Sequence, residues 1–223
     1  MGSGVDKLFL AVAGRPVVAH TWGRFDACPD IDEVVLVVRE GTTETFHALA
    51  RASHWTKPYR VVAGGRERQD SVWAGLSALS SSTELVAIQD GARPCVTSDL
   101  IRACLAAARQ TGAAVAAQRV TDTIKASDDG RVIARHLNRA RLWAVQTPQT
   151  FRVEVIRAAL AAVRTQGLVI TDDTAACELI GQEVQLVESA SPNPKLTTPA
   201  DVAVIELLLQ PRDAAAGSSS GNG

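Results

Sequence analysis

Positively charged side chains recur in the loops of this sequence, and glycines or carboxylates stand beside several of them. Lys7 follows a Gly-Ser-Gly triplet at 2–4; glycines allow the backbone to approach an anion, and a lysine supplies charge. Lys125, Arg139 and Lys195 stand in other predicted loops of a chain whose formal net charge is only −1. Local cations in a nearly neutral protein indicate a polyanionic ligand that carries phosphate.

Two further loops carry groups that suit ligand binding. The stretch from Gly64 to Ser71 (GGRERQDS) combines two glycines with a hydroxyl near a predicted helix N-terminus, where backbone N–H groups bind anions. Asp90 and Arg93 place a carboxylate and a guanidinium in one short loop. Each feature also has a structural interpretation: the glycine pair can be a simple turn, the Asp90–Arg93 pair can brace a loop, and Lys125 can be a solvated charge.

The elements that must position these loops follow an alternating pattern of strands and helices. This alternation predicts an α/β fold with a Rossmann-like, mostly parallel sheet that carries helices on both faces. Ligands of such sheets bind beyond the carboxyl ends of the strands. The predicted strands are 33–39, 60–63, 85–90 and 183–188, and the continuous β-branched run of 33–39 is typical of a strand buried on both faces. The predicted helices are 17–25, 70–79, 98–112 and 153–167, with one more capped by Thr171 and another that has Pro199 as its first helical residue.

The alternation stops in the middle of the chain. Three strand-like pieces at 113–120, 131–137 and 142–145 follow one another without a helix, and Asp128-Asp129-Gly130 is a turn signal between two of them. We predict a β-hairpin arm at about 118–144 that projects from the sheet.

Composition limits what this chain can be. The hydrophobic share of 46% fits one globular domain, placed at 1–211, and the polar tail at 212–223 is expected to be disordered. A formal net charge of −1 gives the protein no general positive field that would attract nucleic acid. No segment has the pattern of a membrane span or a signal peptide. The histidines lack metal-ligand spacing. The cysteines, which predict reduced core thiols in a cytoplasmic protein, are Cys28, Cys95, Cys104 and Cys177.

Together, the motifs resemble those of the 2-C-methyl-D-erythritol 4-phosphate cytidylyltransferases, a family of the non-mevalonate isoprenoid pathway. The resemblance extends from Met1 to about Leu209. Each motif alone is weak, but eight in order at matching spacing are specific. They are Asp6-Lys7 with Gly14-Arg15-Pro16; Gly64-Gly65-Arg66-Glu67-Arg68-Gln69-Asp70-Ser71-Val72; Asp90-Gly91-Ala92-Arg93-Pro94; Asp122-Thr123-Ile124-Lys125; Asn138-Arg139 with Leu142-Trp143; Gln146-Thr147-Pro148-Gln149; Thr171-Asp172-Asp173; and Lys195-Leu196-Thr197-Thr198-Pro199.

The resemblance implies a reaction. The phosphate of methylerythritol phosphate would attack the α-phosphorus of CTP in line, which yields the CDP-alcohol and pyrophosphate. Such chemistry depends on positioning and charge neutralisation. By position, Lys7 would hold the triphosphate and Lys195 would stabilise charge on the α-phosphate. The implied cofactor is a magnesium ion bound through the CTP phosphates, and no metal-ligating residues are assigned.

The resemblance also implies binding residues and a partner. In the family the hairpin arm crosses to a second subunit, so arm residues would complete the neighbouring site and a homodimer is implied. The implied nucleotide-binding residues are Gly65, Arg66, Ser71 and Asp90, and the implied acceptor-binding residues are Arg93, Thr123, Arg139, Thr171 and Lys195.

Two other functions are alternatives. Ribitol-5-phosphate cytidylyltransferases share the glycine loop and the QTPQ stretch, but their pattern lacks the lysine of DTIK and the Leu-Trp pair. Lys125 and Leu142-Trp143 therefore favour methylerythritol phosphate as the acceptor. The second alternative is a non-catalytic remnant that binds CTP or merely dimerises.

The beginning of the chain is where it departs from the family. The family loop usually reads as a strand, then Ala-Ala-Gly-Ser-x-Arg-Arg-Met-Gly, and then the lysine segment; Met1 corresponds to the methionine inside that loop. The resemblance implies that the first strand and a triphosphate-binding arginine are absent, and we favour a start codon further upstream over a natural truncation. A sheet without this strand would have an open slot, so the chain from Met1 is expected to be poorly soluble and hardly active.

Overall fold

The predicted alternation of strands and helices is present in the computed structural model, which describes residues 6–210. The Gly-Ser-Gly triplet at 2–4 and the predicted tail at 212–223 lie outside the described residues. The helices are α1 (Val17–Asp26), α2 (Thr43–Ser53), α3 (Arg68–Ser77), α4 (Ser98–Thr111), α5 (Val153–Thr165), α6 (Asp173–Glu178) and α7 (Asp201–Leu209), with short 3-10 turns at Lys7–Phe9 and Arg139–Arg141. The strands are β1 (Ala11–Val12), β2 (Arg15–Pro16), β3 (Val34–Val38), β4 (Tyr59–Ala63), β5 (Leu85–Ile88), β6 (Ala113–Arg119), β7 (Lys125–Ala126), β8 (Arg135–His136), β9 (Trp143–Arg152) and β10 (Gln185–Glu188).

The central sheet has four strands in the order β10-β6-β9-β5. β10 is parallel to β6, and β9 is antiparallel to both β6 and β5, so three of the four strands run in one direction. β3 and β4 form a second, parallel pair, in which Val34 lies opposite Tyr59 and Val38 opposite Ala63. The predicted α/β class with a mostly parallel strand arrangement is confirmed.

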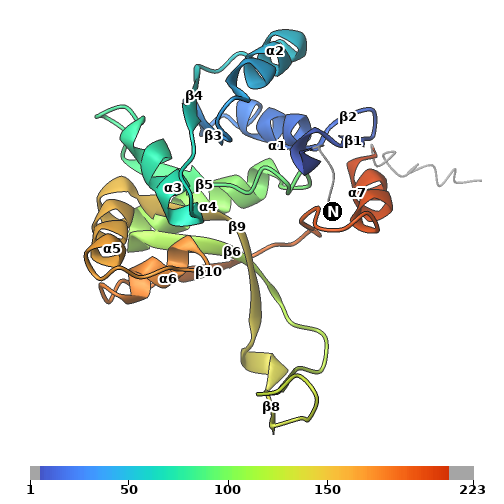
Figure 1. The fold of residues 1–223 in the computed structure, drawn as a ribbon, viewed down its shortest axis with the longest axis vertical. Coiled ribbons are helices and arrows are strands. Elements are labelled where there is room, and N and C mark those ends of the chain that lie inside the picture. The colour runs from blue at the N-terminus through green and yellow to red at the C-terminus, as the bar shows by residue number, and fades with distance from the viewer. Residues whose placement is uncertain (1–5, 211–223) are drawn as a thin grey trace, which may run out of the picture.

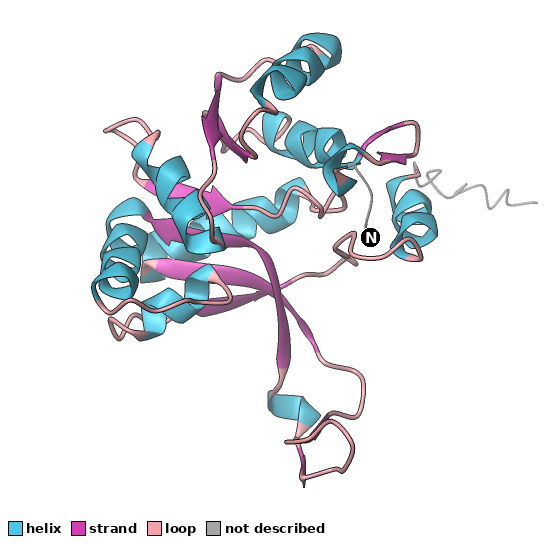
Figure 2. Ribbon diagram, in the orientation of Figure 1, coloured by secondary structure: helices cyan, strands magenta, loops and turns pink. Residues whose placement is uncertain are grey.

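Helices pack on both faces of the central sheet (Figure 2). Phe151 of β9 packs with Ile156 and Leu160 of α5 in one cluster of buried residues. Ile101 of α4 packs with Ala116 of β6 in another. Because these clusters join the sheet to different helices, the sheet is the middle layer of the molecule.

Several element boundaries differ from the sequence expectation. Asp172, rather than Thr171, caps α6, because its Oδ1 accepts a hydrogen bond from the Ala175 N–H at 2.9 Å. Pro199 lies just before α7, which begins at Asp201. Helix α2 was not predicted, and β9 continues through the QTPQ motif to Arg152, although the strand was expected to cover only 142–145.

A long arm projects from the sheet, as predicted (Figure 1). Its base is the β6–β9 pair, where Arg119 lies opposite Trp143, and its outer part is the short β7–β8 pair. The expected turn is present: Asp129 Oδ1 accepts hydrogen bonds from the N–H groups of Arg131 and Val132 at 2.8 and 2.9 Å. The strand expected at 131–137 is reduced to the two residues of β8.

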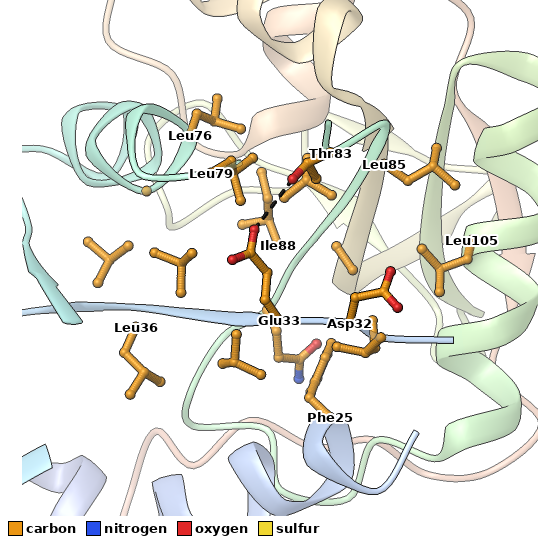
Figure 3. Close-up of a pocket in the computed structure, with 18 of the residues that line it drawn as sticks. Phe25, Asp32, Glu33, Leu36, Leu76, Leu79, Thr83, Leu85, Ile88 and Leu105 are labelled. Atoms are coloured by element: carbon orange, nitrogen blue, oxygen red, sulfur yellow. Dashed lines mark hydrogen bonds between the residues drawn. The ribbon is translucent and has the colours of Figure 1, made fainter. Parts of the chain in front are cut away.

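Strands β3 and β5 are less buried than their apolar sequences predict. Every residue of β5 is only partly buried, and Val37 of β3 is 37% exposed. Both strands line one cavity of about 1470 Å³, which lies between the β3–β4 pair and the central sheet (Figure 3). This cavity is hereafter called the slot.

The cysteines agree with the expectation of reduced core thiols. All four are buried and unpaired, and burial raises the pKa of Cys95 to about 11 and that of Cys104 to about 12. Among residues 6–210, no helix has both the length and the apolar character needed to cross a membrane.

Candidate active site

Three residues singled out in the sequence meet at one small cavity. Lys7, Asp90 and Lys195 line a space of about 310 Å³, hereafter the catalytic cavity. Val38, the last residue of β3, lines it too, and Asp90 follows β5 by two residues. The cavity therefore lies beyond the carboxyl ends of two strands, which is where sheets of this type bind ligands.

Asp90 is the centre of a cationic cluster in this cavity. Its Oδ2 lies 3.0 Å from Lys195 Nζ and 3.3 Å from Arg93 Nε, and its Oδ1 lies 3.2 Å from Arg68 Nη1. Burial alone would raise the pKa of Asp90, but the hydrogen bond and charge of Lys195, together with the two guanidinium groups, outweigh it and lower the pKa. Lys7, Arg39 and Lys195 line the cavity against Asp6 and Asp90, so its wall carries more positive than negative charge.

Backbone contacts hold the loop of Asp90 and the loop of Lys195 together. The Leu196 N–H donates to the Ala92 carbonyl at 2.8 Å. Leu196 directly follows Lys195, and Ala92 lies two residues after Asp90. Arg93 Nη1 donates to the carbonyl of Asn193, also at 2.8 Å. Because the Lys195 loop is bonded on both sides of this residue, the ammonium group is held close to Asp90.

A buried threonine and asparagine connect these loops to the central sheet. The Asp90 N–H donates to Thr147 Oγ1 at 3.1 Å, and Asn193 Nδ2 donates to the Thr147 carbonyl at 2.9 Å. Thr147 belongs to the QTPQ motif of β9. The motif thus has a structural role here, because it fixes both loops that carry the charged residues.

Sequence reasoning missed two residues of this charge network. Arg68 extends Nη2 to Asp173 Oδ2 at 2.6 Å while its Nη1 contacts Asp90. Asp173 is fully buried, and its N–H donates to Gln149 Oε1 of β9 at 2.9 Å. Both residues stand in motifs used for the family resemblance, so the signal was present, but their contact joins positions 105 residues apart.

The glycine loop folds tightly onto the start of α3. The Gly65 N–H donates to Ser71 Oγ at 3.1 Å, and a Cβ atom at Gly65 would lie 2.3 Å from Asp70 Cβ. Only glycine fits there without a shift of the loop. Ser71 lines the slot, which also includes Asp90, whereas the Arg66 side chain is 92% exposed.

The remaining predicted site residues do not line the catalytic cavity. Thr123 and Arg139 lie on the arm and are exposed, and Arg139 Nη1 donates to the Thr121 carbonyl. Thr171 is exposed just before α6. The structure therefore brings together Lys7, Asp90 and Lys195, with Arg93 and Arg68 behind them, and keeps the arm residues apart.

The donor set of the cavity is that of an anion site. Among the described residues, no group of three or more His, Cys, Asp or Glu side chains could hold a metal ion. Both oxygens of Asp90 are occupied by cationic partners. Ammonium and guanidinium groups of this kind bind phosphate oxygens and neutralise charge that forms on them.

The chain matches known proteins over almost its whole length. Residues 1–211 match the family described as IspD, 2-C-methyl-D-erythritol 4-phosphate cytidylyltransferase. A protein of Symbiobacterium thermophilum that bears this enzyme name is 42% identical over 210 residues, covering 94% of this chain and 87% of its own. Another from Desulforamulus reducens is 43% identical over 215 residues, covering 96% and 92%.

Solved structures of similar fold carry names of the same enzyme. The 4-diphosphocytidyl-2C-methyl-D-erythritol synthase of Anaerococcus prevotii superposes with a TM-score of 0.84 at 29% identity, covering 91% of this chain and 92% of its own. The 2-C-methyl-D-erythritol 4-phosphate cytidylyltransferase of Thermus thermophilus gives 0.75 at 33% identity, covering 91% and 93%. Sequence and fold agree that the chain belongs to the 2-C-methyl-D-erythritol 4-phosphate cytidylyltransferase family.

Proposed function

We propose that the catalytic cavity performs the reaction of this family, the transfer of a cytidylyl group from CTP to 2-C-methyl-D-erythritol 4-phosphate. The observation that carries the proposal is the meeting of Lys7, Asp90 and Lys195 at one cavity beyond β3 and β5. The products are 4-diphosphocytidyl-2-C-methyl-D-erythritol and pyrophosphate. An oxygen of the acceptor phosphate forms the new bond to the α-phosphorus, and the bond from that phosphorus to the pyrophosphate oxygen breaks.

Each charged residue of the cavity has a role in this proposal. Lys7 binds the triphosphate, and Lys195 binds the α-phosphate, where negative charge increases as the acceptor oxygen approaches. Asp90, at 3.0 Å from Lys195 Nζ, orients that ammonium group and contacts the ribose side of the nucleotide. Arg93 binds the acceptor, and Gly65, Arg66 and Ser71 bind cytosine. Charge placed in advance in this way stabilises the transition state without reorganisation during the reaction.

We further propose that a magnesium ion accompanies CTP into the site. The described residues offer no cluster of metal ligands, so the ion would be held by the triphosphate oxygens and would partly neutralise them. Free, buried thiols support a cytoplasmic location.

The arm supports a homodimer in which the two sites share residues. It projects from the sheet (Figure 1) and carries exposed apolar side chains, with Val132 68% and Ile133 63% exposed. Apolar groups at the end of a projecting hairpin favour contact with another protein surface. In a dimer, Thr123 and Arg139 of one arm would bind the acceptor phosphate in the partner's site, together with Thr171 of that site.

A competition experiment tests the choice of acceptor. The chain is incubated with CTP, magnesium and equal amounts of methylerythritol 4-phosphate and ribitol 5-phosphate, and the two CDP-alcohols are quantified by mass spectrometry. We expect mainly the methylerythritol product, since Lys125 and Leu142-Trp143 match that family. A larger yield of CDP-ribitol would assign the chain to the alternative function.

A further inference from the structure

Arg68, the first residue of α3, contacts two carboxylates that come from different parts of the chain. Its Nη2 lies 2.6 Å from Oδ2 of Asp173, and its Nη1 lies 3.2 Å from Oδ1 of Asp90. Oδ2 of Asp90 in turn lies 3.0 Å from Nζ of Lys195. A continuous chain of charge contacts therefore runs from the fully buried Asp173 to the ammonium group at the catalytic cavity.

The contact between Arg68 and Asp173 differs from an ion pair that serves stability alone. An arginine and a carboxylate frequently form two parallel hydrogen bonds that use both oxygens. Here, within residues 6–210, Asp173 Oδ1 and Arg68 Nε are buried and have no hydrogen-bond partner, and buried polar groups without partners lower stability. The guanidinium is instead divided between two carboxylates, so it reaches Asp90 at the expense of a second bond to Asp173.

This division fixes the orientation of the Asp90 carboxylate. Its Oδ1 faces Arg68, while its Oδ2 is shared by Arg93 Nε at 3.3 Å and Lys195 Nζ at 3.0 Å. The backbone of the same residue is held by the hydrogen bond from its N–H to Thr147 Oγ1 at 3.1 Å. Because the two oxygens of a carboxylate belong to one rigid plane, a rotation that changed the contact with Arg68 would also move Oδ2 relative to Lys195.

Asp173 is itself held in a defined position. It is the first residue of α6, and its N–H donates to Gln149 Oε1 of β9 at 2.9 Å. Burial raises the pKa of Asp173, whereas the charge and the hydrogen bond of Arg68 oppose this rise. The negative charge of Asp173 and the position of Arg68 therefore depend on each other.

We propose that Asp173 is a positioning residue for cytidylyl transfer, which acts through Arg68 on the Asp90 carboxylate. Asp173 retains the Nη2 side of the guanidinium, so only Nη1 contacts Asp90, and Oδ2 of that carboxylate stays available to Lys195. Without the charge of Asp173, the guanidinium turns both of its donors to Asp90, occupies both oxygens and displaces the ammonium group. The inference rests on the proposed function only for the role of Lys195 in the reaction.

Competitive labelling of lysines tests this contact without reference to turnover. The native chain, Asp173→Asn and the control Asp172→Asn are treated with a small amount of acetic anhydride, and acetylation of Lys195 relative to Lys57 is measured by mass spectrometry. An amine that loses a charge-assisted hydrogen bond is more accessible to the reagent, so we expect Lys195 of Asp173→Asn to react at least about threefold faster. Asp172 caps α6, and asparagine preserves a cap, so its replacement should leave the labelling unchanged.

A double variant separates displacement by Arg68 from a general loosening of the site. Adding Arg68→Met to Asp173→Asn removes the competing guanidinium, so the labelling rate of Lys195 should return to that of the native chain. Loosening of the loops would instead keep the rate high, or raise it further. Urea unfolding of each variant shows that the labelled chains are folded.

Kinetics connects the contact to the reaction. Misplacement of a reacting group by about 1 Å can cost about 100-fold in rate, so Asp173→Asn should lower kcat by about 10–100-fold and leave the KM for CTP nearly unchanged. Combined with Lys195→Ala it should be no slower than Lys195→Ala alone, because both changes remove the same contact.

Three results would overturn the proposal: native labelling of Lys195 in Asp173→Asn, equally fast labelling in Asp172→Asn, or rate losses of Asp173→Asn and Lys195→Ala that multiply in the double variant. Labelling that stays fast after Arg68→Met is added would also overturn it. A native chain that forms no product would contradict the proposed function alone, since the labelling experiment still decides whether Asp173 positions Lys195.

Discussion

Arg68 links the deepest charge of the site to the carboxylate that holds Lys195. It lies 2.6 Å from Asp173 and 3.2 Å from Asp90. Burial disfavours a charge on Arg68, but the two carboxylates outweigh it and raise the pKa of its guanidinium, so the group stays charged. The individual charged residues were visible in the sequence, but their pairing was not, since it depends on loops that the fold brings together.

Arg68→Ala should destabilise the protein by about 3–5 kcal/mol, because it leaves the fully buried Asp173 without its cation. Adding Asp173→Asn should recover part of that loss. Urea unfolding of both single variants and the double variant measures the coupling. Additive effects would show that the two side chains do not depend on each other.

The stabilisation from Asp90 should depend on pH. Its pKa is lowered in the folded protein, so its contribution is present above the unfolded value, about 3.9, and is lost as the pH falls through the folded value. Asp90→Asn should therefore cost about 1.5–3 kcal/mol near pH 6, and the difference from the native chain should shrink below about pH 4. Urea unfolding at several pH values measures this difference. Asp128→Asn, in the exposed arm turn, is the control, and a difference for Asp90→Asn that stays constant with pH would contradict the account.

The elements divide into those with a local sequence signal and those that depend on packing. Helix α4 was predicted with its C-cap, because its apolar face repeats regularly and Gly112 has a φ of +92°. Helix α2 was missed, since it buries only Phe46 and Ala50. The length of β9 was underestimated because Pro148 lies inside it, and proline usually argues against a strand interior.

The arm element should act in acceptor binding. Arg139→Ala should raise the KM for methylerythritol phosphate by about 10–150-fold, since a hydrogen bond to a charged group contributes about 1.5–3 kcal/mol, and should leave the KM for CTP nearly unchanged. Arg141→Ala, on the same exposed 3-10 turn, is the matched control. Steady-state kinetics with each substrate varied in turn measures both effects. An equal rise in both KM values would contradict a specific role in acceptor binding.

Subunit mixing tests whether the arm acts across a dimer. Arg139→Ala chains and Lys7→Ala chains are mixed in equal amounts and allowed to exchange. Random pairing makes half the dimers mixed, each with one intact site, so about a quarter of native activity should return. No recovery after exchange has been confirmed would mean that each chain uses its own arm.

At the scale of the whole molecule, the α/β class, the arm and the family were predictable, because alternating strands, helices and ordered motifs are properties of the sequence itself. The exact charge contacts of the site required the fold, since residues such as Asp90 and Lys195 meet only when β5 and the segment after β10 lie side by side. The slot lies between the β3–β4 pair and the central sheet, and it shares Leu8, Val38 and Asp90 with the catalytic cavity.

The central claim is that Lys7, Asp90 and Lys195 form the site of cytidylyl transfer. The most direct measurement is the rate of pyrophosphate release from CTP and methylerythritol phosphate by the native chain, Lys195→Ala and the control Lys57→Ala, whose lysine lies on the loop before β4. Loss of one transition-state contact typically lowers kcat by about 10²–10³, so we predict that decrease for Lys195→Ala and no change for Lys57→Ala. Native turnover by a folded Lys195→Ala chain would contradict the account.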